Sequence, residues 1–326
     1  MTGASGFIGG AVLCRLNREG AVAARGTVRR HPLNIPASIE LAVVGDLGPQ
    51  TNWTHALEGV DAVVHTAARV HVMRESALDP LAEFRRVNVS GTLALARQAA
   101  AAGVSRFVFI SSVKVNGEGT VPGRPYTATD GPAPVDPYGV SKLEAEQGLF
   151  EVTGETQMRV SIIRPVLVYG PGVKGNFLTL MRWVHKGIPL PLGAIHNQRS
   201  LVSLENLIDL IVTCLDHPAA PGRVFMVSDG EDLSTTALIR RVAAALGRPA
   251  RLVPVPAAGL LALARVLGKG DVAQRLCGSL QVDINSTREL LGWSPPVSVD
   301  HALKETTRHF LAAVHSRRAP GSIAIV

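Results

Sequence analysis

The sequence predicts an α/β fold, a doubly wound parallel sheet with a second, smaller domain in the C-terminal half. Three observations lead to this prediction. Apolar runs alternate with segments of helical periodicity through the first half of the 326 residues. Glycines gather at the start of the chain, directly before an apolar helix. Beyond Pro165, Gly and Pro become dense and the alternation loses its regularity. Continuous apolar strands that alternate with helices are typical of a parallel sheet covered on both faces.

The first half of the chain contains five expected strands and four expected helices. The strands are short runs of apolar and β-branched residues that cover 21–30, 39–47, 61–68, 106–112 and 159–165. The helices between them cover 6–19, 52–58, 80–102 and 137–152. Only Met1 and Thr2 stand where the central strand should precede the glycines, so we expect a truncated first strand and a true start upstream.

The glycines at the start have the spacing of a phosphate-binding loop. Gly3, Gly6 and Gly9 run into an apolar helix that includes Phe7 and Ile8. Such glycines permit a tight turn and a close approach of the backbone to a pyrophosphate, and the helix presents its N-terminus to that anion. The loop therefore predicts that the first domain binds a dinucleotide.

The second half returns to the sheet before it completes a smaller domain. Residues 203–215 have the pattern of a helix and residues 223–230 that of a strand, and both are expected in the first domain. The dinucleotide-binding domain is then expected over 1–169 and 199–228, and the substrate domain over 170–198 and 229–315. We expect a loose tail over 316–326.

Composition and charge limit the classes of function. Apolar residues make up 46% of the chain and charged residues 18%, which is typical of a soluble globular protein. The formal charge of +7 suits an anionic partner. Because Lys and Arg are scattered and aromatic residues are only 4%, we expect a phosphate-bearing small molecule and no nucleic acid.

Cysteines and apolar runs indicate a cytoplasmic protein. The three cysteines are widely spaced and match no metal-binding pattern, so we expect reduced thiols and no metal. The first residues do not resemble a signal peptide. The longest apolar run, residues 254–268, is too short to span a membrane. We expect it to be a helix of the substrate domain rather than a helix on a membrane surface.

The candidate catalytic residues lie in two segments. Tyr138 and Lys142 are four residues apart on an expected helix, so the phenol and the ammonium share one face. A cation beside the phenol favours phenolate and allows proton exchange near neutral pH. Ser111 and Ser112 end a buried strand, at the carboxyl edge where such folds bind ligands. A serine hydroxyl there can hydrogen-bond a carbonyl or alkoxide, so Ser, Tyr and Lys together suit hydride transfer.

With these motifs the chain resembles the extended short-chain dehydrogenase/reductases, which have a Rossmann fold, and among them the nucleotide-sugar epimerases, dehydratases and reductases. The resemblance covers nearly the whole sequence. Its segments are TGASGFIG, GDL, VVHTAA, VNVSGT, FISSVKVNG, PYGVSK, IIRPVLVYGPG, NQRSLVSLENLIDL and LLGW.

The resemblance implies a role for each matching residue. Ser112, Tyr138 and Lys142 would be catalytic, with Tyr138 as acid or base and Lys142 also gripping the nicotinamide ribose. The cofactor, NAD or NADP, would contact Gly3, Gly6, Phe7, Ile8, Gly9, Asp46, Leu47, His65, Ala67, Ala68 and Asn88. The substrate would contact Ser111, Lys114, Asn176, Arg199 and Arg275. Among these, Asn176 and Arg199 match positions that bind a nucleotide-sugar diphosphate.

Two departures separate the subfamilies. The dehydratases follow the site serine with an Asp-Glu pair, whereas Val113 and Lys114 follow Ser112 here, so we do not expect a dehydratase. Arg29 and Arg30 end the strand expected over 21–30, where an acidic residue would bind the ribose of NAD. Arginine there suits the 2′-phosphate of NADP, although a solvent-facing arginine fits the pattern equally well.

The expected function is hydride transfer at C4 of a UDP-hexosamine. Arg29 and Arg30 favour a 4-keto-6-deoxy sugar 4-reductase of surface polysaccharide synthesis, with NADP slightly favoured as cofactor. A UDP-GlcNAc or UDP-glucose 4-epimerase is the alternative, because the same catalytic residues serve both reactions. A reductase of a steroid- or flavonoid-like carbonyl and a dinucleotide sensor without catalysis are also compatible with the fold. We expect a homodimer paired through residues 80–102 and 137–152, and no membrane partner.

Overall fold

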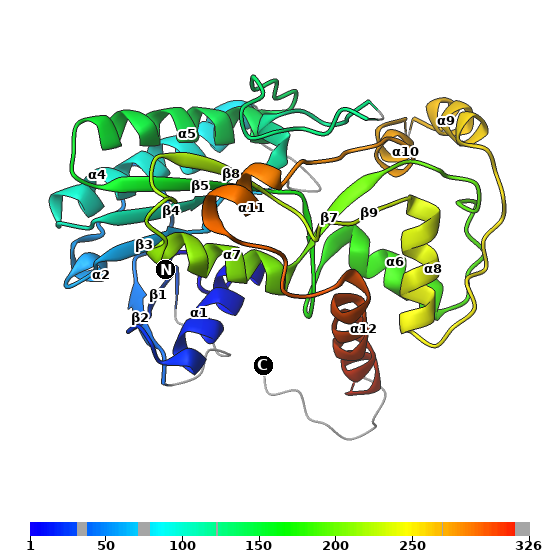
Figure 1. Cartoon of the computed structure of the whole chain (residues 1–326), viewed down its shortest axis with the longest axis horizontal. Helices are drawn as coiled ribbons and strands as arrows, with labels where there is room; N and C mark the ends of the chain where they lie inside the picture. The colour runs from blue at the N-terminus through cyan, green and yellow to red at the C-terminus, as the bar shows by residue number, and fades with distance from the viewer. Residues whose placement is uncertain (31–37, 71–78, 122, 269, 317–326) are drawn as a thin grey trace.

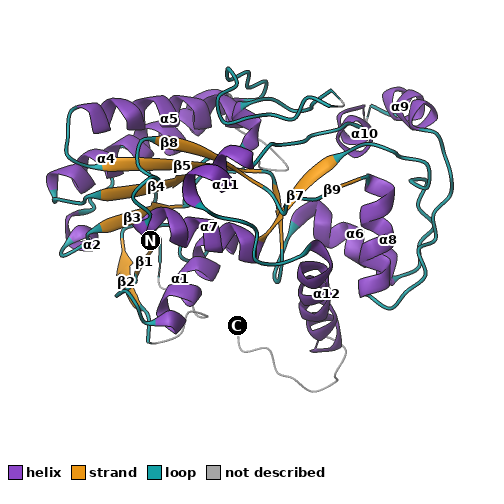
Figure 2. Cartoon of the chain, in the orientation of Figure 1, coloured by secondary structure: helices purple, strands orange, loops and turns teal. Residues whose placement is uncertain are grey.

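The computed structural model describes residues 1–30, 38–70, 79–121, 123–268 and 270–316. A parallel four-stranded sheet, in the order β3-β4-β5-β8, forms the centre of the larger unit of the fold, which we call the sheet half (Figures 1 and 2). Its strands are β3 (Ala62–His65), β4 (Arg106–Ile110), β5 (Arg159–Pro165) and β8 (Arg223–Val227). Two further parallel strands, β1 (Arg25–Val28) and β2 (Glu40–Val43), pair with each other. The predicted parallel α/β sheet is confirmed.

Met1 and Thr2 lie between β1 and β3. The amide of Thr27 donates to the carbonyl oxygen of Met1 over 2.8 Å. The amide of Thr2 donates to the carbonyl oxygen of Val64 over 2.9 Å. Thr2 also forms a parallel bridge with His65. These contacts link the two sets of strands, so the glycine loop that follows Thr2 starts from the middle of the sheet.

Helices cover both faces of the sheet, as the doubly wound class requires. One face is covered by α5 (Pro137–Gly154) and by the helical stretch that ends in α4 (Gly91–Ala101) (Figure 1). The core on this face contains Leu95, Phe107 and Leu149. The other face is covered by α1 (Phe7–Glu19), α7 (Leu204–Asp216) and α11 (Asn285–Leu291). The short α2 (Thr54–Leu57) packs beside β2.

The helix expected over residues 80–102 is present but changes its winding midway. It consists of α3 (Pro80–Phe84), the π-helical segment η1 (Arg85–Ser90) and α4. Asp79 caps its start, because its carboxylate accepts a hydrogen bond from the amide of Ala82 over 3.0 Å. A π-helical turn holds an extra residue, and such turns are frequent at functional sites.

The second half forms a smaller unit with its own apolar core. There β7 (Arg199–Ser203) pairs in parallel with β6 (Leu167–Tyr169) and antiparallel with β9 (Asp232–Leu233). The helices that pack on this core are α6 (Gly175–His185), α8 (Thr235–Ala245) and α12 (Val299–Ser316). At the outer edge lie α9 (Ala257–Val266) and α10 (Gly270–Cys277) (Figure 1). Within the described ranges, no helix has the length and apolar character needed to cross a membrane.

The division into domains stays a prediction, and the packing bears on one part of it. Leu280, Leu291 and Trp293 lie in the core of the sheet half, together with residues of β8 and α7. The hydroxyl of Thr287 donates to the carbonyl oxygen of Met226 in β8 over 2.8 Å. Residues 280–293 therefore pack on the sheet, within the range 229–315 that the sequence analysis gives to the substrate domain. The expected tail, after Ser316, lies outside the described residues.

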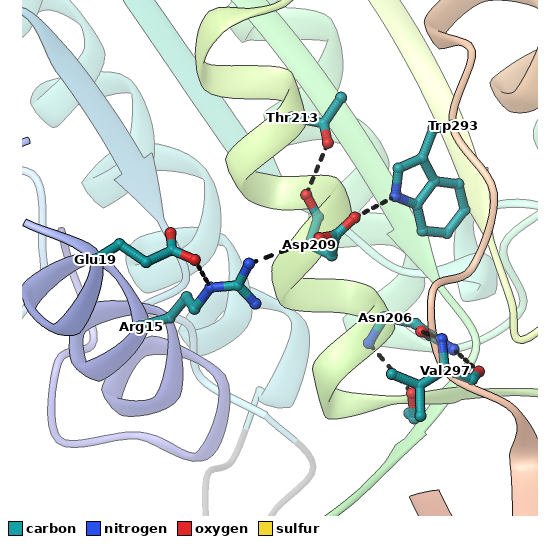
Figure 3. Close-up of polar contacts among 8 residues, drawn as sticks. Arg15, Glu19, Asn206, Asp209, Thr213, Trp293 and Val297 are labelled. Atoms are coloured by element: carbon teal, nitrogen blue, oxygen red, sulfur yellow. Dashed lines mark hydrogen bonds and ion pairs between the residues drawn. The ribbon is translucent and has the colours of Figure 1, made fainter. Parts of the chain in front are cut away.

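Helix α7 makes polar contacts with two remote segments (Figure 3). The carboxylate of Asp209 accepts a hydrogen bond from the indole of Trp293 over 2.8 Å, and it lies 3.8 Å from the guanidinium of Arg15 on α1. One turn earlier, Asn206 exchanges two hydrogen bonds of 2.9 Å with the backbone of Val297. One helix thus holds both α1, which follows the glycine loop, and the segment that leads into α12.

Candidate active site

Ser112 and Tyr138 meet at the carboxyl edge of the sheet. Ser112 follows β4, and its hydroxyl accepts a hydrogen bond of 3.2 Å from the amide of Lys114 at the start of the short 3-10 helix η2 (Val113–Val115). Asp136 caps α5 by accepting from the amide of Gly139 over 2.6 Å, which sets Tyr138 in the first turn. The side chain of Ser112 acts on the phenol of Tyr138 and lowers its pKa. Two of the three expected catalytic groups therefore lie at the same place.

Lys142 lies one helical turn beyond Tyr138 and is only 2% exposed. Its ammonium donates to the carbonyl oxygen of Ile110 over 2.8 Å and lies 4.4 Å from the centre of the Phe109 ring. Burial lowers the pKa of Lys142 from 10.5 to about 7, and the nearby carboxylate of Glu146 partly opposes this. The group is therefore held at the end of β4, where it can gain or lose a proton near neutral pH.

Tyr138 is a phenol rather than a phenolate in this structure. Burial and the charge of Asp136 raise the pKa of Tyr138 to about 12, and the hydrogen bond from Ser112 opposes them only in part. The sequence analysis expected a neighbouring ammonium to favour phenolate. Here Lys142 makes its hydrogen bond to Ile110, so desolvation outweighs attraction between the two side chains.

Behind the serines lies a buried polar network. Glu146 on α5 forms an ion pair with Arg164 on β5, and both side chains are almost fully buried. Ser111 donates its hydroxyl hydrogen to the same carboxylate. Arg164 also donates to the side-chain oxygen of Asn116 over 3.1 Å. Ser111, expected to contact substrate, is 3% exposed and is directed into this network.

Asn88 and His65 support the site from the other side. Asn88 lies in η1, where its carboxamide bonds the backbone amide and carbonyl of Arg69 over 2.8 and 3.0 Å and donates to Ser141 over 3.0 Å. The hydroxyl of Ser141 in turn donates to the carbonyl oxygen of Tyr138 over 2.8 Å. His65 is fully buried, with both ring nitrogens bonded to threonine hydroxyls. Burial lowers the pKa of His65 to about 3, so the ring is a neutral part of the core.

The glycine loop leaves room only for glycine at two positions. Gly3 has φ +68°, and an added Cβ would lie 2.7 Å from the hydroxyl of Thr66. A Cβ on Gly9 would lie 2.2 Å from the carbonyl oxygen of Gly3. Next to the loop, Phe7 is half-buried and packs against both apolar cores. The loop therefore presents bare backbone at the N-terminus of α1, which fits a pyrophosphate.

A cavity of about 500 Å³ lies beyond β2, and its lining includes Asp46, Thr51 and Arg86. Leu47 packs on Gly91, since a Cβ there would come within 3.0 Å of the leucine. The cavity is at the position expected to hold the adenine. At the end of β1, the guanidinium of Arg29 lies 3.6 Å from the carboxylate of Asp46, and both are exposed.

The remaining expected cofactor residues lie along the same edge. Ala67 and Ala68 are half-buried directly after β3, and the amide of Ala67 donates to the hydroxyl of Thr2 over 3.3 Å. Gly6 and Ile8 belong to the loop and the first turn of α1. Arg30 is exposed beside Arg29. In the described part of the chain, no group of three or more His, Cys, Asp or Glu residues could hold a metal ion.

Comparison with known proteins decides the family. The model of the NAD dependent epimerase/dehydratase family matches residues 1–228. This chain belongs to that family. It is 48% identical to a Vibrio cholerae UDP-glucose 4-epimerase over 314 residues, covering 96% of this chain and 95% of the relative. It is 28% identical to a 3-beta-hydroxysteroid dehydrogenase of Mycolicibacterium neoaurum over 99% of this chain and 93% of the relative.

Solved structures agree with this assignment. MoeE5 in complex with UDP-glucuronic acid and NAD superposes with a TM-score of 0.75 and 25% identity, covering 96% of this chain and 98% of that one. The resemblance to extended short-chain dehydrogenase/reductases is therefore confirmed. The cofactor of this NAD-dependent epimerase/dehydratase is NAD or NADP, and the glycine loop has the bare backbone that such a cofactor needs.

Three of the expected substrate residues of this epimerase/dehydratase lie in the smaller unit. Asn176 is exposed in the first turn of α6. Arg199 donates to the carbonyl oxygens of Arg275 and Gly278, over 2.9 and 3.0 Å. Arg275 itself is exposed on α10. Lys114 forms ion pairs with Asp136 and with Glu118, so its charge lies beside the cap of α5.

The sequence analysis missed the groups that hold the site together. Glu146 is four residues after Lys142 on α5, a spacing that could have identified it. Its partner Arg164 stands on β5, and only the tertiary structure brings the two together. Asn197 is similar, because its carboxamide joins Thr235, Leu276 and Gly278, which are remote in sequence.

Proposed function

We propose that the protein is a 4-epimerase of a UDP-hexose or UDP-hexosamine. The observation that carries the proposal is the placement of Ser112 after β4 and of Tyr138 in the first turn of α5, with Lys142 one turn further on at the end of β4. The V. cholerae relative supports the same assignment, since its name is UDP-glucose 4-epimerase and the identity of 48% extends over nearly both chains.

In this proposal each side chain has one task. Tyr138 first gives its own proton to solvent, then takes the proton at the sugar O4 as a phenolate and returns it as a phenol, while Ser112 donates a hydrogen bond to that oxygen. Lys142 binds the ribose of the cofactor, and near neutral pH its ammonium can carry a positive charge one turn beyond Tyr138. When bound, NAD supplies the hydride acceptor and donor for C4. The Gly3 to Gly9 loop and the N-terminus of α1 bind its pyrophosphate.

The substrate diphosphate is assigned to Asn176 and Arg199. Arg199 stays charged on a short strand, and its orientation is fixed by the carbonyl oxygens that it bonds. Asn176 supplies a carboxamide from the first turn of α6. Val113 and Lys114, which follow Ser112, provide no carboxyl group for an elimination, so water loss is not part of the proposal.

The test is to incubate the purified protein with UDP-glucose or UDP-GlcNAc, without added cofactor, and to follow the sugar by NMR. The appearance of the galacto epimer supports an epimerase that retains its NAD. A folded protein that binds dinucleotide and leaves both sugars unchanged overturns the epimerase proposal.

A 4-keto-6-deoxy sugar 4-reductase is the second candidate, and Arg29 and Arg30 favour it. Both arginines are exposed at the end of β1, where a 2′-phosphate would bind. Such an enzyme would need added NADPH and a 4-keto sugar. Consumption of NADPH with that substrate, and no epimer from UDP-glucose, would support this candidate.

A steroid-type reductase and a dinucleotide sensor would behave differently from both enzymes. A steroid-type reductase, suggested by the M. neoaurum relative, would not bind UDP, and a dinucleotide sensor would not need Tyr138. Displacement of a labelled UDP by UDP-sugar, with turnover that requires Tyr138, would exclude both.

The expected assembly is a homodimer, and we propose that it forms through α4 and α5. Phe150 on α5 is 38% exposed, which leaves an aromatic ring available for such a contact. A sedimentation coefficient that falls to that of a monomer in Phe150→Glu would support this interface. A cytoplasmic location stays a prediction.

A further inference from the structure

Helix α9 exposes an apolar surface at the outer edge of the smaller unit (Figure 1). None of its residues is buried. Its inner side is half-buried, with Ala257 and Leu260 against the neighbouring core. On its outer side, Leu263 is 58% exposed and Val266 is 83% exposed. The helix is therefore apolar on the side that faces solvent, which is unusual for a soluble monomer.

The exposed apolar surface continues beyond the helix. Leu267 follows α9 and is 62% exposed, and Val253 precedes it and is 46% exposed. Val253 donates from its amide to the carbonyl oxygen of Leu190 over 2.8 Å. We call the three residues Leu263, Val266 and Leu267, which lie close together in the chain, the apolar patch.

All the charged residues in the segment that carries the patch are basic. Between Asp232 and Asp271 the sequence has no acidic residue. The same stretch contains six basic ones: Arg240, Arg241, Arg248, Arg251, Arg265 and Lys269. Arg265 is exposed and stands between the residues of the patch in the chain, and Arg251 is exposed in the segment before α9. Exposed apolar side chains flanked by arginines are the composition of a helix that lies in a lipid headgroup layer. A second copy of the same patch would meet like charges instead.

We propose that the apolar patch docks on the surface of an anionic lipid bilayer. Helix α9 is ten residues long, too short to cross a bilayer, so it would lie in the plane of the interface. Leu263, Val266 and Leu267 enter the headgroup layer, and Arg251 and Arg265 contact lipid phosphates. Since α10 follows α9 directly and the carbonyl oxygens near its C-terminal end bind Arg199, docking would hold the smaller unit against the bilayer.

The test is flotation of the purified protein with unilamellar vesicles at low salt. One vesicle contains phosphatidylcholine alone and the other contains equimolar phosphatidylglycerol. We expect the wild type to float with the anionic vesicles and to be released by high salt. The double variant L263E/V266E should lose at least about tenfold of the bound fraction, because two inserted side chains become charged. The matched control is Val22→Glu, which changes a valine that is 53% exposed in the sheet half; its binding should stay unchanged.

Three outcomes overturn the proposal. The first is a wild type that remains unbound to anionic vesicles at low salt. The second is an L263E/V266E variant that floats as well as V22E, when both variants melt at the temperature of the wild type. The third is a variant that alters the sedimentation coefficient of the protein alone while no form floats, which would make the patch a contact between copies of this chain.

Discussion

Lys142 donates a hydrogen bond of 2.8 Å to the carbonyl oxygen of Ile110, and this contact fixes an ammonium group inside the fold at the end of β4. The carbonyl offers a partner but no negative charge, so the desolvation of the ammonium is only partly offset. The first prediction follows from this balance.

The stability of the protein should depend on pH through Lys142. Burial lowers its pKa from 10.5 to about 7, so the unfolded chain binds the proton more tightly between these values. The free energy of unfolding contributed by this group therefore rises with pH from about 7 and is lower below it. Burial of Cys214 and Tyr138 acts in the opposite sense at higher pH. Urea denaturation at a series of pH values measures the free energy of unfolding of the wild type and of Lys142→Met. Between about pH 7 and pH 9 this free energy should change with pH at different rates in the two proteins. Equal pH dependences would contradict the prediction.

Removing the phenol of Tyr138 should abolish turnover without loss of cofactor binding. The Tyr138→Phe variant lacks the only group proposed to move the proton at O4, so we expect a fall in kcat of at least about 100-fold. Dinucleotide affinity, measured by fluorescence titration, should stay unchanged. Tyr126→Phe is the control, because that hydroxyl donates to Gly119 outside the site. Retained turnover in Tyr138→Phe would refute the mechanism.

Removing one partner of the buried ion pair should lower the free energy of unfolding more than removing both partners. Glu146→Gln leaves the Arg164 guanidinium buried and unpaired, and we expect a loss of about 3–5 kcal/mol in the free energy of unfolding. The double variant Glu146→Gln, Arg164→Met should be more stable than the single one, because the unpaired charge is gone. Denaturation of both variants measures this. A double variant that is the less stable of the two would argue against an ion pair that is costly to break.

A methyl group in the glycine loop should block the cofactor. In Gly9→Ala the added carbon would lie 2.2 Å from the carbonyl oxygen of Gly3, so the turn must shift. We expect dinucleotide affinity to fall by more than about tenfold. At Gly154, the last residue of α5, a Cβ would meet nothing within 4 Å, and Gly154→Ala should bind normally. Isothermal titration compares them, and equal affinities would remove the loop from the proposed site.

Arg29 and Arg30 decide between the two candidate reactions through the cofactor. If they bind a 2′-phosphate, the double variant R29A/R30A should raise the KM for NADPH by at least about tenfold and leave that for NADH unchanged. Arg223→Ala, an exposed arginine at the start of β8, is the control. A double variant with unaltered NADPH kinetics would mean that both arginines simply face solvent.

Local patterns in the sequence predicted the groups that we propose to be catalytic, whereas tertiary contacts determine which groups hold them in place. The positions of Tyr138, Lys142 and Ser112 were predictable because helical spacing and a strand end are visible in a short window of sequence. The contact of Glu146 with Arg164 was not, because it depends on α5 packing against β5. His65 was expected along the cofactor, yet its ring bonds Thr2 and Thr92 in the core, and these partners stand on other elements.

The π-helical segment η1 has a consequence for how this chain can change in length. An extra residue in a helix turns every later side chain by about 100° relative to an uninterrupted α-helix. Asn88 reaches both Arg69 and Ser141 from within that segment. Deleting a single residue from Arg85–Ser90 would give a more regular helix. The Asn88 carboxamide would then turn away from Arg69 and Ser141 and lose its hydrogen bonds with them. A surplus residue, which looks like an imperfection, is therefore a feature that a deletion cannot remove without loosening Tyr138.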